Sequence, residues 1–391
     1  MKIIAFYLPQ FHNIPENDEW WGDGFTEWVN VKKAKPLYKG HIQPKIPLNG
    51  NYYDLLDDNV KIWQAKIAKK YGVYGFCYYH YWFNGKLLLE KPMEQMLANK
   101  NIDMPFCICW ANEAWTKAWV NSSQTLIPQK YGGKREWKDH FDYLLQFFKD
   151  ERYIKCDGKP LLVIYKPELI ECGNDMIDYF QKLAKNAGFP GLCMAYQHGN
   201  MDFYSEKKDD SRYDLDIEFQ PIYARYERDK AVQASGIRAI LKDIYYKASI
   251  LLGKKLGTEI NIRGLTKDSD TVRTYDYDEI WSYILNKEVI DSKRVPGAFA
   301  TWDNTPRHGI NGHVYTGSTP EKFEKYLTKL IKKAKEEYHK DMIFIYAWNE
   351  WAEGGYLEPD KENGYGYLEA IYKALKATGE LPEYEGRKCI R

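Results

Sequence analysis

The run MIFIYAWNEWAEGG, residues 342–355, joins an apolar stretch to a cluster of acidic and aromatic residues. Its first part is nearly continuously apolar, which predicts a buried strand. Glu350 and Glu353 follow directly, and Gly354–Gly355 gives the backbone freedom to turn away afterwards. A buried strand that ends in carboxylates is typical of the place where a barrel of strands and helices builds its reactive face.

Seven similar runs precede this one along the chain. The eight predicted strands are KIIAFYLP (2–9), YGFCYYHYW (74–82), MPFCICW (104–110), PLLVIYK (160–166), GLCMAYQ (191–197), DLDIEFQPIY (214–223), VPGAFATW (295–302) and MIFIYAW (342–348). Helical patterns, with apolar residues at i, i+3 and i+4, lie between most of them, at 57–72, 137–150, 176–188 and 319–338. Strands alternating with helices in this number predict an α/β fold, a (β/α)8 TIM barrel, as a single domain over 1–391.

An open, doubly wound sheet is the alternative, because the order of strands is not written in a sequence. The segment after the first predicted strand, YLPQFHNIP, contains no glycine, so it lacks the phosphate-binding loop common in such sheets. Two connections are long, 10–56 and 224–294, and the second includes a helical pattern at 236–253. In a barrel, long loops after the first and sixth strands form walls of the active face. The last ~20 residues are expected to be a surface tail.

The overall composition excludes several classes of partner. The chain has 56 Lys and Arg against 55 Asp and Glu, a formal net charge of +1, so no global charge favours nucleic acid or an anionic membrane. No run reaches the ~18 apolar residues of a transmembrane segment. The seven cysteines are odd in number and lack zinc spacing, which favours a reducing compartment. With an N-terminus too quickly polar for a signal peptide, the sequence predicts a cytoplasmic protein.

Aromatic residues make up 16% of the chain and often stand beside polar ones, as in YYHYWF (78–83), CWANEAW (109–115) and DEWWGDGFTEW (18–28). Trp and Tyr rings stack on the C–H faces of sugars, while carboxylates and amides bind the hydroxyls. These mixtures indicate a carbohydrate site. For each residue taken singly, a packed role in the core is the alternative.

Polar and aromatic residues occur at or near the ends of all eight predicted strands. The candidate substrate contacts are Tyr7, Trp28, Tyr79, His80, Tyr81, Trp110, Asn112, Glu113, Tyr165, Lys166, Gln197, His198, Gln220, Tyr223, Trp302, Asp303, Trp348, Asn349 and Trp351. Arg307 also follows the seventh strand, without an assigned role. The histidines among them are more often satisfied core residues than acid–base groups.

Glu350 and Glu353 are the candidate catalytic residues. If the strand ends near Trp348 and one helical turn follows, their Cβ atoms lie ~5–6 Å apart. Such a pair suits glycosidic chemistry with retention, where two carboxyls ~5–5.5 Å apart divide the acid and base roles. Mutual repulsion and the flanking indoles are expected to separate their pKa values. An exposed acidic turn without function is the alternative.

Several stretches closely resemble the WbsX-type proteins, which are encoded among genes for O-antigen, capsule and other surface polysaccharides. These are FYLPQFH (6–12), residues 20–47, CWANEAWT (109–116) and WNEWAEGGYLEPD (348–360). Through them the chain is also similar to glycoside hydrolase family 99, the endo-α-mannosidases, which have a (β/α)8 fold and no metal. The resemblance therefore implies neither a metal nor another cofactor.

The mannosidases carry an N-E-W-H-E-G motif, matched here by Asn349 to Gly354. The resemblance implies that Glu350 deprotonates the sugar 2-hydroxyl, whose oxygen attacks C1 to give a 1,2-anhydro sugar. It implies that Glu353 protonates the leaving oxygen and then activates water. Ala352 stands where those enzymes have histidine, so the sugar and the linkage stay open.

The sequence thus predicts an enzyme that acts on α-glycosidic bonds of a surface polysaccharide or its precursor, with a glycan as its partner and no nucleic acid. A glycosyltransferase with an activated sugar donor is the alternative. Its weak sequence support is two Asp-x-Asp motifs, in DLD (214–216) and YDYDE (275–279), which could bind a metal ion that holds the donor's diphosphate. A glycan-binding scaffold without catalysis is a third reading, from a different class.

Overall fold

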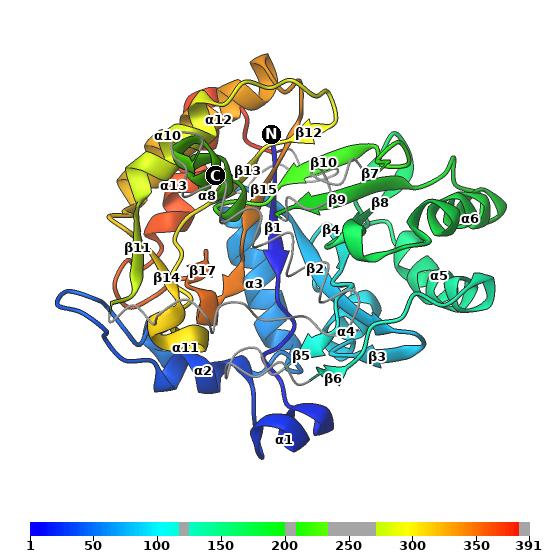
Figure 1. Ribbon diagram of the computed structural model, residues 1–391, viewed down its shortest axis with the longest axis horizontal. Coiled ribbons are helices and arrows are strands. Elements are labelled where there is room, and N and C mark those ends of the chain that lie inside the picture. The colour runs from blue at the N-terminus through cyan, green and yellow to red at the C-terminus, as the bar shows by residue number, and fades with distance from the viewer. Residues whose placement is uncertain (117–124, 200–208, 234–270, 383–391) are drawn as a thin grey trace.

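The computed structural model describes residues 1–116, 125–199, 209–233 and 271–382. All eight predicted strands are present in one parallel sheet, with helices around it (Figure 1). In chain order the barrel strands are β1 (Lys2–Tyr7), β2 (Val73–Phe83), β4 (Phe106–Trp110), β8 (Lys159–Ile164), β9 (Cys193–His198), β10 (Leu215–Glu218), β12 (Arg294–Val295) with β13 (Gly297–Phe299), and β15 (Met342–Tyr346). The (β/α)8 prediction is confirmed, and the open sheet is excluded.

The barrel closes through its seventh strand, which is divided at Pro296 into β12 and β13. β12 pairs with β10, opposite Asp216, and β13 pairs with β15, opposite Phe344. Pro296 has no backbone N–H, but its carbonyl accepts a hydrogen bond from the N–H of Phe344 at 3.1 Å. β13 and β10 approach so closely that a Cβ on Gly297 would lie 1.7 Å from the carbonyl oxygen of Glu218. Closure therefore requires glycine at this position.

The outer layer consists of amphipathic helices. The predicted ones appear as α3 (Asp58–Lys70), α5 (Lys134–Phe148), α6 (Gly173–Asn186) and α12 (Pro320–Glu336), and they are joined by α4 (Lys91–Ala98), α8 (Ile222–Gln233), α10 (Tyr277–Asn286) and α13 (Gly366–Thr378). In α12, the Thr319 side chain caps the helix by accepting from the N–H of Lys322, and Pro320 occupies the first turn. Phe323 and Leu327 of this helix are buried against the barrel side.

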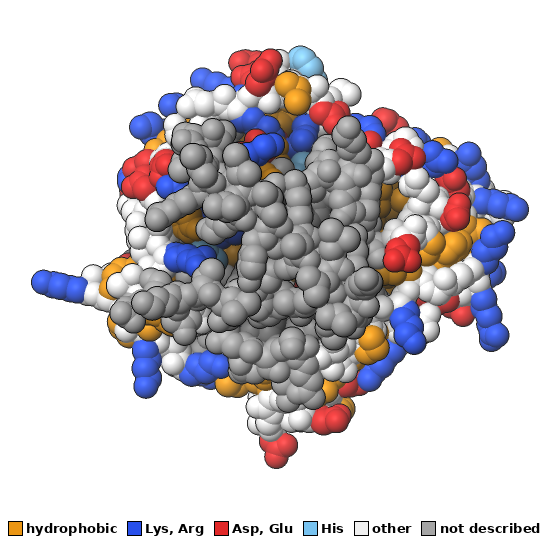
Figure 2. All heavy atoms as spheres, viewed as in Figure 1, with side chains coloured by type: hydrophobic (Ala, Val, Ile, Leu, Met, Phe, Trp, Pro, Cys, Tyr) orange, Lys and Arg blue, Asp and Glu red, His pale blue; other side chains and the backbone are white. Residues whose placement is uncertain are grey.

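Shorter elements sit on the connections. They are α1 (Pro15–Trp21), α2 (Glu27–Lys33), β3 (Lys86–Leu88), β5 (Trp115–Thr116), β6 (Thr125–Ile127), β7 (Lys155–Cys156), β11 (Arg273–Asp276), α11 (Thr305–His308), β14 (His313–Thr316), β16 (Asn349–Glu350) and β17 (Gly355–Tyr356). The long connection after β1 carries α1 and α2, as the sequence predicted for a wall of the active face. Figure 2 shows acidic and basic side chains interspersed around the periphery, in keeping with the net charge of +1.

Two predictions about chain segments need correction. The sixth predicted strand, 214–223, runs too far, because β10 ends at Glu218 and α8 begins at Ile222. The expected surface tail is wrong up to residue 382: α13 packs against α12, and its Ala374 and Leu375 are fully buried. The helical pattern at 236–253 and residues 383–391 lie outside the described residues. Among the helices that are described, none combines the length and the apolar character needed to cross a bilayer.

Candidate active site

The chain leaving β15 presents Glu350 and Glu353 from adjoining short elements. Glu350 ends β16, and a single 3-10 turn over Trp351–Glu353 follows it. Gly354 ends that turn with a φ of 60°, and a Cβ there would lie 2.6 Å from the backbone nitrogen of Asp303. The turn predicted between the two glutamates is therefore present, and it depends on glycine to close.

Arg307 joins the two glutamates. Its Nη2 donates to Oε2 of Glu350 at 3.1 Å, and its Nη1 donates to Oε1 of Glu353. Its Nε donates to Oε2 of a third carboxylate, Glu27, at 3.2 Å. Arg307 lies on α11 after the seventh strand, whereas Glu27 lies on α2 after the first. The Arg307 guanidinium, on the loop after the seventh strand, thus binds carboxylates from the loops after the first and the eighth strands.

Burial and charge set the protonation of this cluster. Glu350 is 4% exposed, and burial raises its pKa to about 8, with Arg307 opposing the shift and the charges of Glu353 and Glu27 adding to it. Burial also raises the pKa of Glu27, against the pull of Arg307. Burial alone would lower the pKa of Arg307, but the three carboxylates hold it well above the usual value. The guanidinium therefore stays charged, while Glu350 favours its protonated form near neutral pH.

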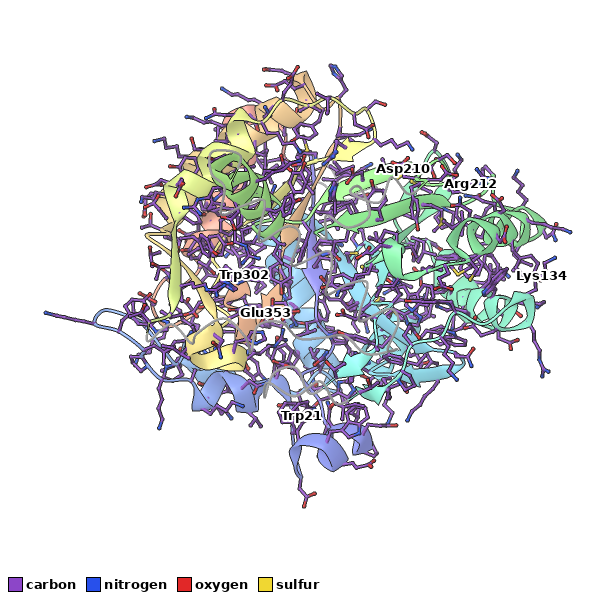
Figure 3. All side chains as sticks on the ribbon, viewed as in Figure 1. Trp21, Lys134, Asp210, Arg212, Trp302 and Glu353 are labelled. Carbon is purple, nitrogen blue, oxygen red and sulfur yellow. The ribbon has the colours of Figure 1, made fainter. Side chains whose placement is uncertain are left out.

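Tyr346 supports Glu353 from the inner wall of the barrel. Its hydroxyl donates to Oε2 of Glu353 at 2.5 Å. Its ring lies 4.8 Å from the ring of Trp302 and 4.9 Å from that of Phe219, measured between centroids. Figure 3 shows Trp302 and Glu353 near the middle of the molecule, while Lys134 lies at its margin. An aromatic wall thus adjoins the carboxylate that the resemblance names as the acid.

Tyr81 and Tyr79 of β2 form a second tyrosine wall. Gln10 donates to the hydroxyl of Tyr81 at 3.0 Å, and Gln197 donates to the hydroxyl of Tyr79 at 3.2 Å. Burial raises the pKa of both tyrosines, and the charge of Glu350 adds to both shifts. Both hydroxyls therefore stay protonated close to Glu350.

The ends of β4 and β8 carry another polar group. Asn112 accepts from the N–H of Lys166 and donates to its carbonyl, both at 2.7 Å. The Lys166 ammonium pairs with Glu113. Burial raises the pKa of Tyr165, and the charges of Glu113 and Glu353 contribute to this shift. Tyr165 therefore lies within electrostatic range of both Glu113 and Glu353.

Seven of the predicted substrate contacts lie on the outer face of the barrel instead. They are Tyr7, His80, Trp110, His198, Gln220, Tyr223 and Trp348. Tyr7 donates to Gln64 of α3 at 2.7 Å, and Nε2 of His80 lies 3.0 Å from Nε2 of His140 on α5. Burial lowers the pKa of His80 to about 3, which keeps it neutral. The prediction is corrected for these residues. Tyr7, His80, Trp110 and His198 lie on strands, whose alternate side chains point outward, whereas Gln220, Tyr223 and Trp348 follow strand ends and are buried in packing contacts.

The remaining outer members of the set follow the same pattern. The ring of Trp110 lies 4.7 Å from that of His140, and Nδ1 of His198 lies 3.0 Å from Asp216. Gln220 accepts from the N–H of Ala224 at the start of α8. Tyr223 is in contact with Lys287, and the Trp348 ring lies 4.9 Å from that of Phe76. These contacts lie within the barrel wall or join it to the helices that cover it.

Trp28 and Trp351 support the catalytic turn from below. Their ring centroids are 5.6 Å apart, and both residues are at least nine-tenths buried. Trp351 donates its Nε1 to Glu358 at 2.7 Å, and Glu358 also accepts from Gln64 and Tyr53. Burial raises the pKa of Glu358 to about 7. These two tryptophans are therefore packing residues rather than the substrate contacts that the sequence predicted.

Asn349 and Asp303 also act on the backbone of the site. Asn349 accepts from the N–H of Leu8 at 2.8 Å and donates to its carbonyl at 3.0 Å. The N–H of Asp303 donates to the carbonyl of Glu353 at 2.8 Å, and its carboxylate pairs with His41 at 2.7 Å. Both residues fix the turn that carries the two glutamates.

Sequence reasoning missed Glu27 and Glu358 and gave Arg307 no role. Glu27 stands in the aromatic run 18–28, so an acidic residue within that run was the available signal. Glu358 lies near the end of the motif 348–360, but nothing in the spacing shows that it lies buried and bonded to Trp351.

Both aspartates of the DLD stretch, residues 214–216, have protein partners in the barrel wall. Asp214 accepts from the N–H of Met194 at 2.9 Å. Asp216 lies 3.0 Å from His198 and 3.0 Å from Nε of Arg294. In the part of the chain that the structure describes, no three His, Cys, Asp or Glu side chains group as metal ligands would.

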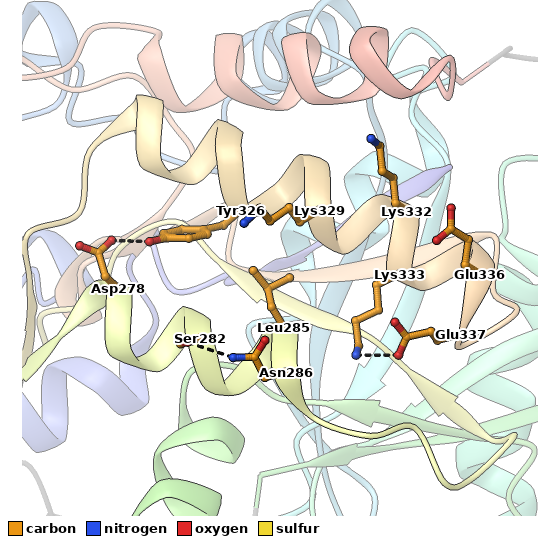
Figure 4. A pocket seen from close by; sticks show the side chains of 10 residues that line it. All are labelled: Asp278, Ser282, Leu285, Asn286, Tyr326, Lys329, Lys332, Lys333, Glu336 and Glu337. Carbon is orange, nitrogen blue, oxygen red and sulfur yellow. Dashed lines mark hydrogen bonds and ion pairs between the residues drawn. The ribbon is translucent and has the colours of Figure 1, made fainter.

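Two surface cavities, of about 680 and 360 Å³, lie beside α10, outside the barrel. Figure 4 shows the smaller one, between α10 and α12, where Tyr326 donates to Asp278 and Lys333 to Glu337. Neither cavity is lined by Glu350 or Glu353. The chemistry of the carboxylate cluster, rather than cavity size, therefore locates the candidate active site.

Comparison with known proteins shows the family and the fold of this chain. Residues 3–371 match the family model described as Glycosyltransferase WbsX. The chain belongs to the WbsX family. Two curated relatives, both called uncharacterized protein WxcX, come from Xanthomonas campestris pv. campestris strains ATCC 33913 and B100. Each is 33% identical over 381 residues, which cover 97% of this chain and 50% of the relative. This WbsX chain thus spans about half the length of the curated relatives it matches.

Solved structures share the fold of this WbsX family member. The GH99 endo-alpha-mannosidase from Bacteroides thetaiotaomicron matches with a TM-score of 0.54 and 14% identity, over 97% of this chain and 98% of that one. A glycoside hydrolase-like protein matches with a TM-score of 0.56 and 13% identity, over 95% and 93%. At these identities the likeness shows the barrel fold, and the predicted resemblance to both families is confirmed.

Proposed function

We propose that this WbsX family member is a glycan-processing enzyme of polysaccharide biosynthesis, cleaving α-glycosidic bonds of a surface polysaccharide or its precursor. The observation that carries the proposal is the bridge from Arg307 to both Glu350 and Glu353. The bridge holds two carboxyls of unlike environment beside aromatic walls, where a barrel presents its reactive groups. The site does not choose the sugar or the linkage.

The proposed reaction retains configuration and uses the substrate's own 2-hydroxyl. Glu350 takes the proton of the 2-hydroxyl while the sugar oxygen O2 attacks C1, and the bond between C1 and the leaving oxygen breaks. Glu353 protonates the leaving oxygen. In the second step water adds to C1 of the 1,2-anhydro sugar, Glu353 takes the proton of the water, and Glu350 returns its proton to O2.

The proton needed for this reaction belongs to the pair rather than to one residue. Without substrate, burial favours the proton on Glu350, while Glu353 accepts from Arg307 and Tyr346. A sugar 2-hydroxyl that donates to Glu350 favours its ionised form, which moves the proton to Glu353. Substrate binding would thereby establish the reactive arrangement.

A glycosyltransferase with an activated sugar donor is the second candidate, and the family description favours it. A sugar diphosphate needs a metal or a basic grip. Asp276 caps α10 by accepting from the N–H of Glu279, and Asp278 pairs with Lys322. The cations at the cluster, Arg307 and Lys166, are paired with carboxylates. A transfer reaction that reuses the same site, with a glycan acceptor in place of water, fits these contacts better than a diphosphate grip does.

A noncatalytic glycan-binding scaffold is disfavoured by the two motif glutamates that the chain retains.

We also propose a cytoplasmic location, since the six cysteines in the described ranges are free.

The test is mass spectrometry of products formed from α-linked oligosaccharides in ¹⁸O-labelled water, with and without added nucleotide sugars. Label in a new reducing end, lost in Glu353→Gln, is the expected result. Lengthened, unlabelled glycans that appear only with a nucleotide sugar would establish the transferase. Binding of glycans without any product, unchanged in Glu350→Gln, would establish the scaffold.

A further inference from the structure

Glu27 is a carboxylate of the cluster that lies outside the motif carrying Glu350 and Glu353. It sits in the first turn of α2 and is 0% exposed. Its Oε2 lies 3.2 Å from both Nε and Nη2 of Arg307. The same guanidinium reaches Glu350 through Nη2 and Glu353 through Nη1. Glu27 can therefore act on both glutamates through Arg307.

The charges of this cluster do not balance when every carboxyl is ionised. One guanidinium against three carboxylates leaves a net charge of two negative units in a buried site. The other titratable side chains that interact with it are the tyrosines Tyr79, Tyr81, Tyr165 and Tyr346, and burial raises the pKa of each, so they stay neutral and add no charge. Two ion pairs lie next to the cluster, Asp303 with His41 and Lys166 with Glu113, and in each the acidic group already has a basic partner. Retention of one proton by the cluster relieves part of the repulsion.

We propose that Glu27 is a positioning residue, which occupies Arg307 and so keeps one proton on the Glu350–Glu353 pair near neutral pH. This inference rests on the proposed function, because that proton is the one delivered to the leaving oxygen. With Glu27 ionised, Arg307 is shared among three carboxylates and stabilises the charge of each motif glutamate less. Without the Glu27 charge, Arg307 neutralises the pair more fully, and the pair loses its proton at lower pH.

The test is the pH profile of kcat/KM for Glu27→Gln, measured on the α-linked oligosaccharide that the unaltered protein cleaves. The alkaline limb should move to lower pH by about one unit or more, as expected when a nearby like charge is removed. Activity should then fall at neutral pH and recover as the pH is lowered. Glu27→Asp, which keeps the charge, should keep the alkaline limb closer to that of the parent.

The control is Glu19→Gln, the same change at an exposed position of the same long connection, and its profile should match the parent's. An alkaline limb that stays in place in Glu27→Gln, with activity reduced equally at every pH, overturns the inference. That outcome would mean that Glu27 is purely structural or itself carries the proton.

Infrared titration of the unaltered protein provides a second test that needs neither turnover nor folding of Glu27→Gln. A carboxylic acid C=O band should persist near neutral pH and weaken in Glu350→Gln or in Glu353→Gln. Because Glu358 can also be protonated and absorb in the same spectral region, the decisive observation is a weaker band in one of these two variants than in the unaltered protein. If neither variant changes the band, the pair holds no proton and the inference fails. If no oligosaccharide is cleaved, the proposed function fails, while the titration still reports on the proton.

Discussion

Arg307 and Glu350 are joined by a hydrogen bond of 3.1 Å between Nη2 and Oε2, in a site where both side chains are more than nine-tenths buried. The residues come from the ends of different barrel strands, so the contact exists only once the barrel has closed. It ties the protonation of the candidate site to the stability of the fold.

Replacement of Arg307 by Met should destabilise the protein strongly. The buried carboxylates Glu27 and Glu350 and the partly buried Glu353 would lose their shared cation, and breaking a buried ion pair on one side costs about 3–5 kcal/mol. The urea midpoint of unfolding measures the effect. Arg212→Met is the control, because its ion pair with Asp178 is exposed, and its midpoint should stay near that of the parent. Equal midpoints for the two variants would contradict the bridge.

Glu350→Gln should gain stability relative to the parent as the pH rises from 5 to 8. The folded pKa of about 8 lies above the ordinary value of 4.5, so between these values the folded state binds more protons than the unfolded state. Stability of the parent therefore falls as the pH rises, and Gln has no such proton to lose.

The gain from pH 5 to pH 8 should be about 3–4 kcal/mol, measured as the change in the difference between the urea unfolding free energies of the two proteins. Glu19→Gln, at an exposed position, serves as the control and should show a difference independent of pH. A difference for Glu350→Gln that is equally flat would mean that Glu350 is ionised in the folded protein.

Tyr346→Phe should lower kcat at least 10-fold while leaving the fold intact. The variant loses the hydroxyl that donates to Glu353, and a hydrogen bond to a charged group contributes about 1.5–3 kcal/mol. Steady-state kinetics on the cleaved oligosaccharide measure the change. Tyr326→Phe removes a comparable hydroxyl bonded to Asp278, away from the site, and should keep full activity. Unchanged kcat in Tyr346→Phe would exclude Tyr346 from the reaction.

Gly297→Ala should destabilise the barrel by several kcal/mol or prevent its folding. The new Cβ would lie 1.7 Å from the carbonyl oxygen of Glu218, so β10 and β13 would have to separate. Thermal unfolding followed by circular dichroism measures the loss. Gly173→Ala is the control, since its Cβ would meet only ordinary contacts of 3.7 Å with Ile170. Comparable melting temperatures for both variants would show that the strands are not held this closely.

The fold could be predicted from local patterns because most barrel strands are nearly continuous apolar runs and the helices between them are amphipathic. The end of the sixth strand was misjudged, because Phe219 and Ile222 are apolar whether the chain is extended or turning into α8. The tail was misjudged because α13 is stabilised by packing on α12, which a sequence does not display.

The site could be predicted only in part. The turn carrying Glu350 and Glu353 is local, so its spacing and its glycines are readable in the sequence. Residues such as His80 and Trp110 were misplaced, because a strand end shows which side chains are present but not which face they occupy. Glu27 lies 280 positions from Arg307, and no local pattern records such a contact.

β1 lies between β2 and β15, so the first strand to be synthesised pairs along one edge with the last strand of the barrel. While the ribosome is still translating the middle of the chain, that edge has no partner, and open strand edges invite association between chains. That edge stays open to such association until residues 342–346 have been synthesised and can pair with β1. Only once β15 has joined the barrel can Glu27 and Glu350 meet on the same arginine.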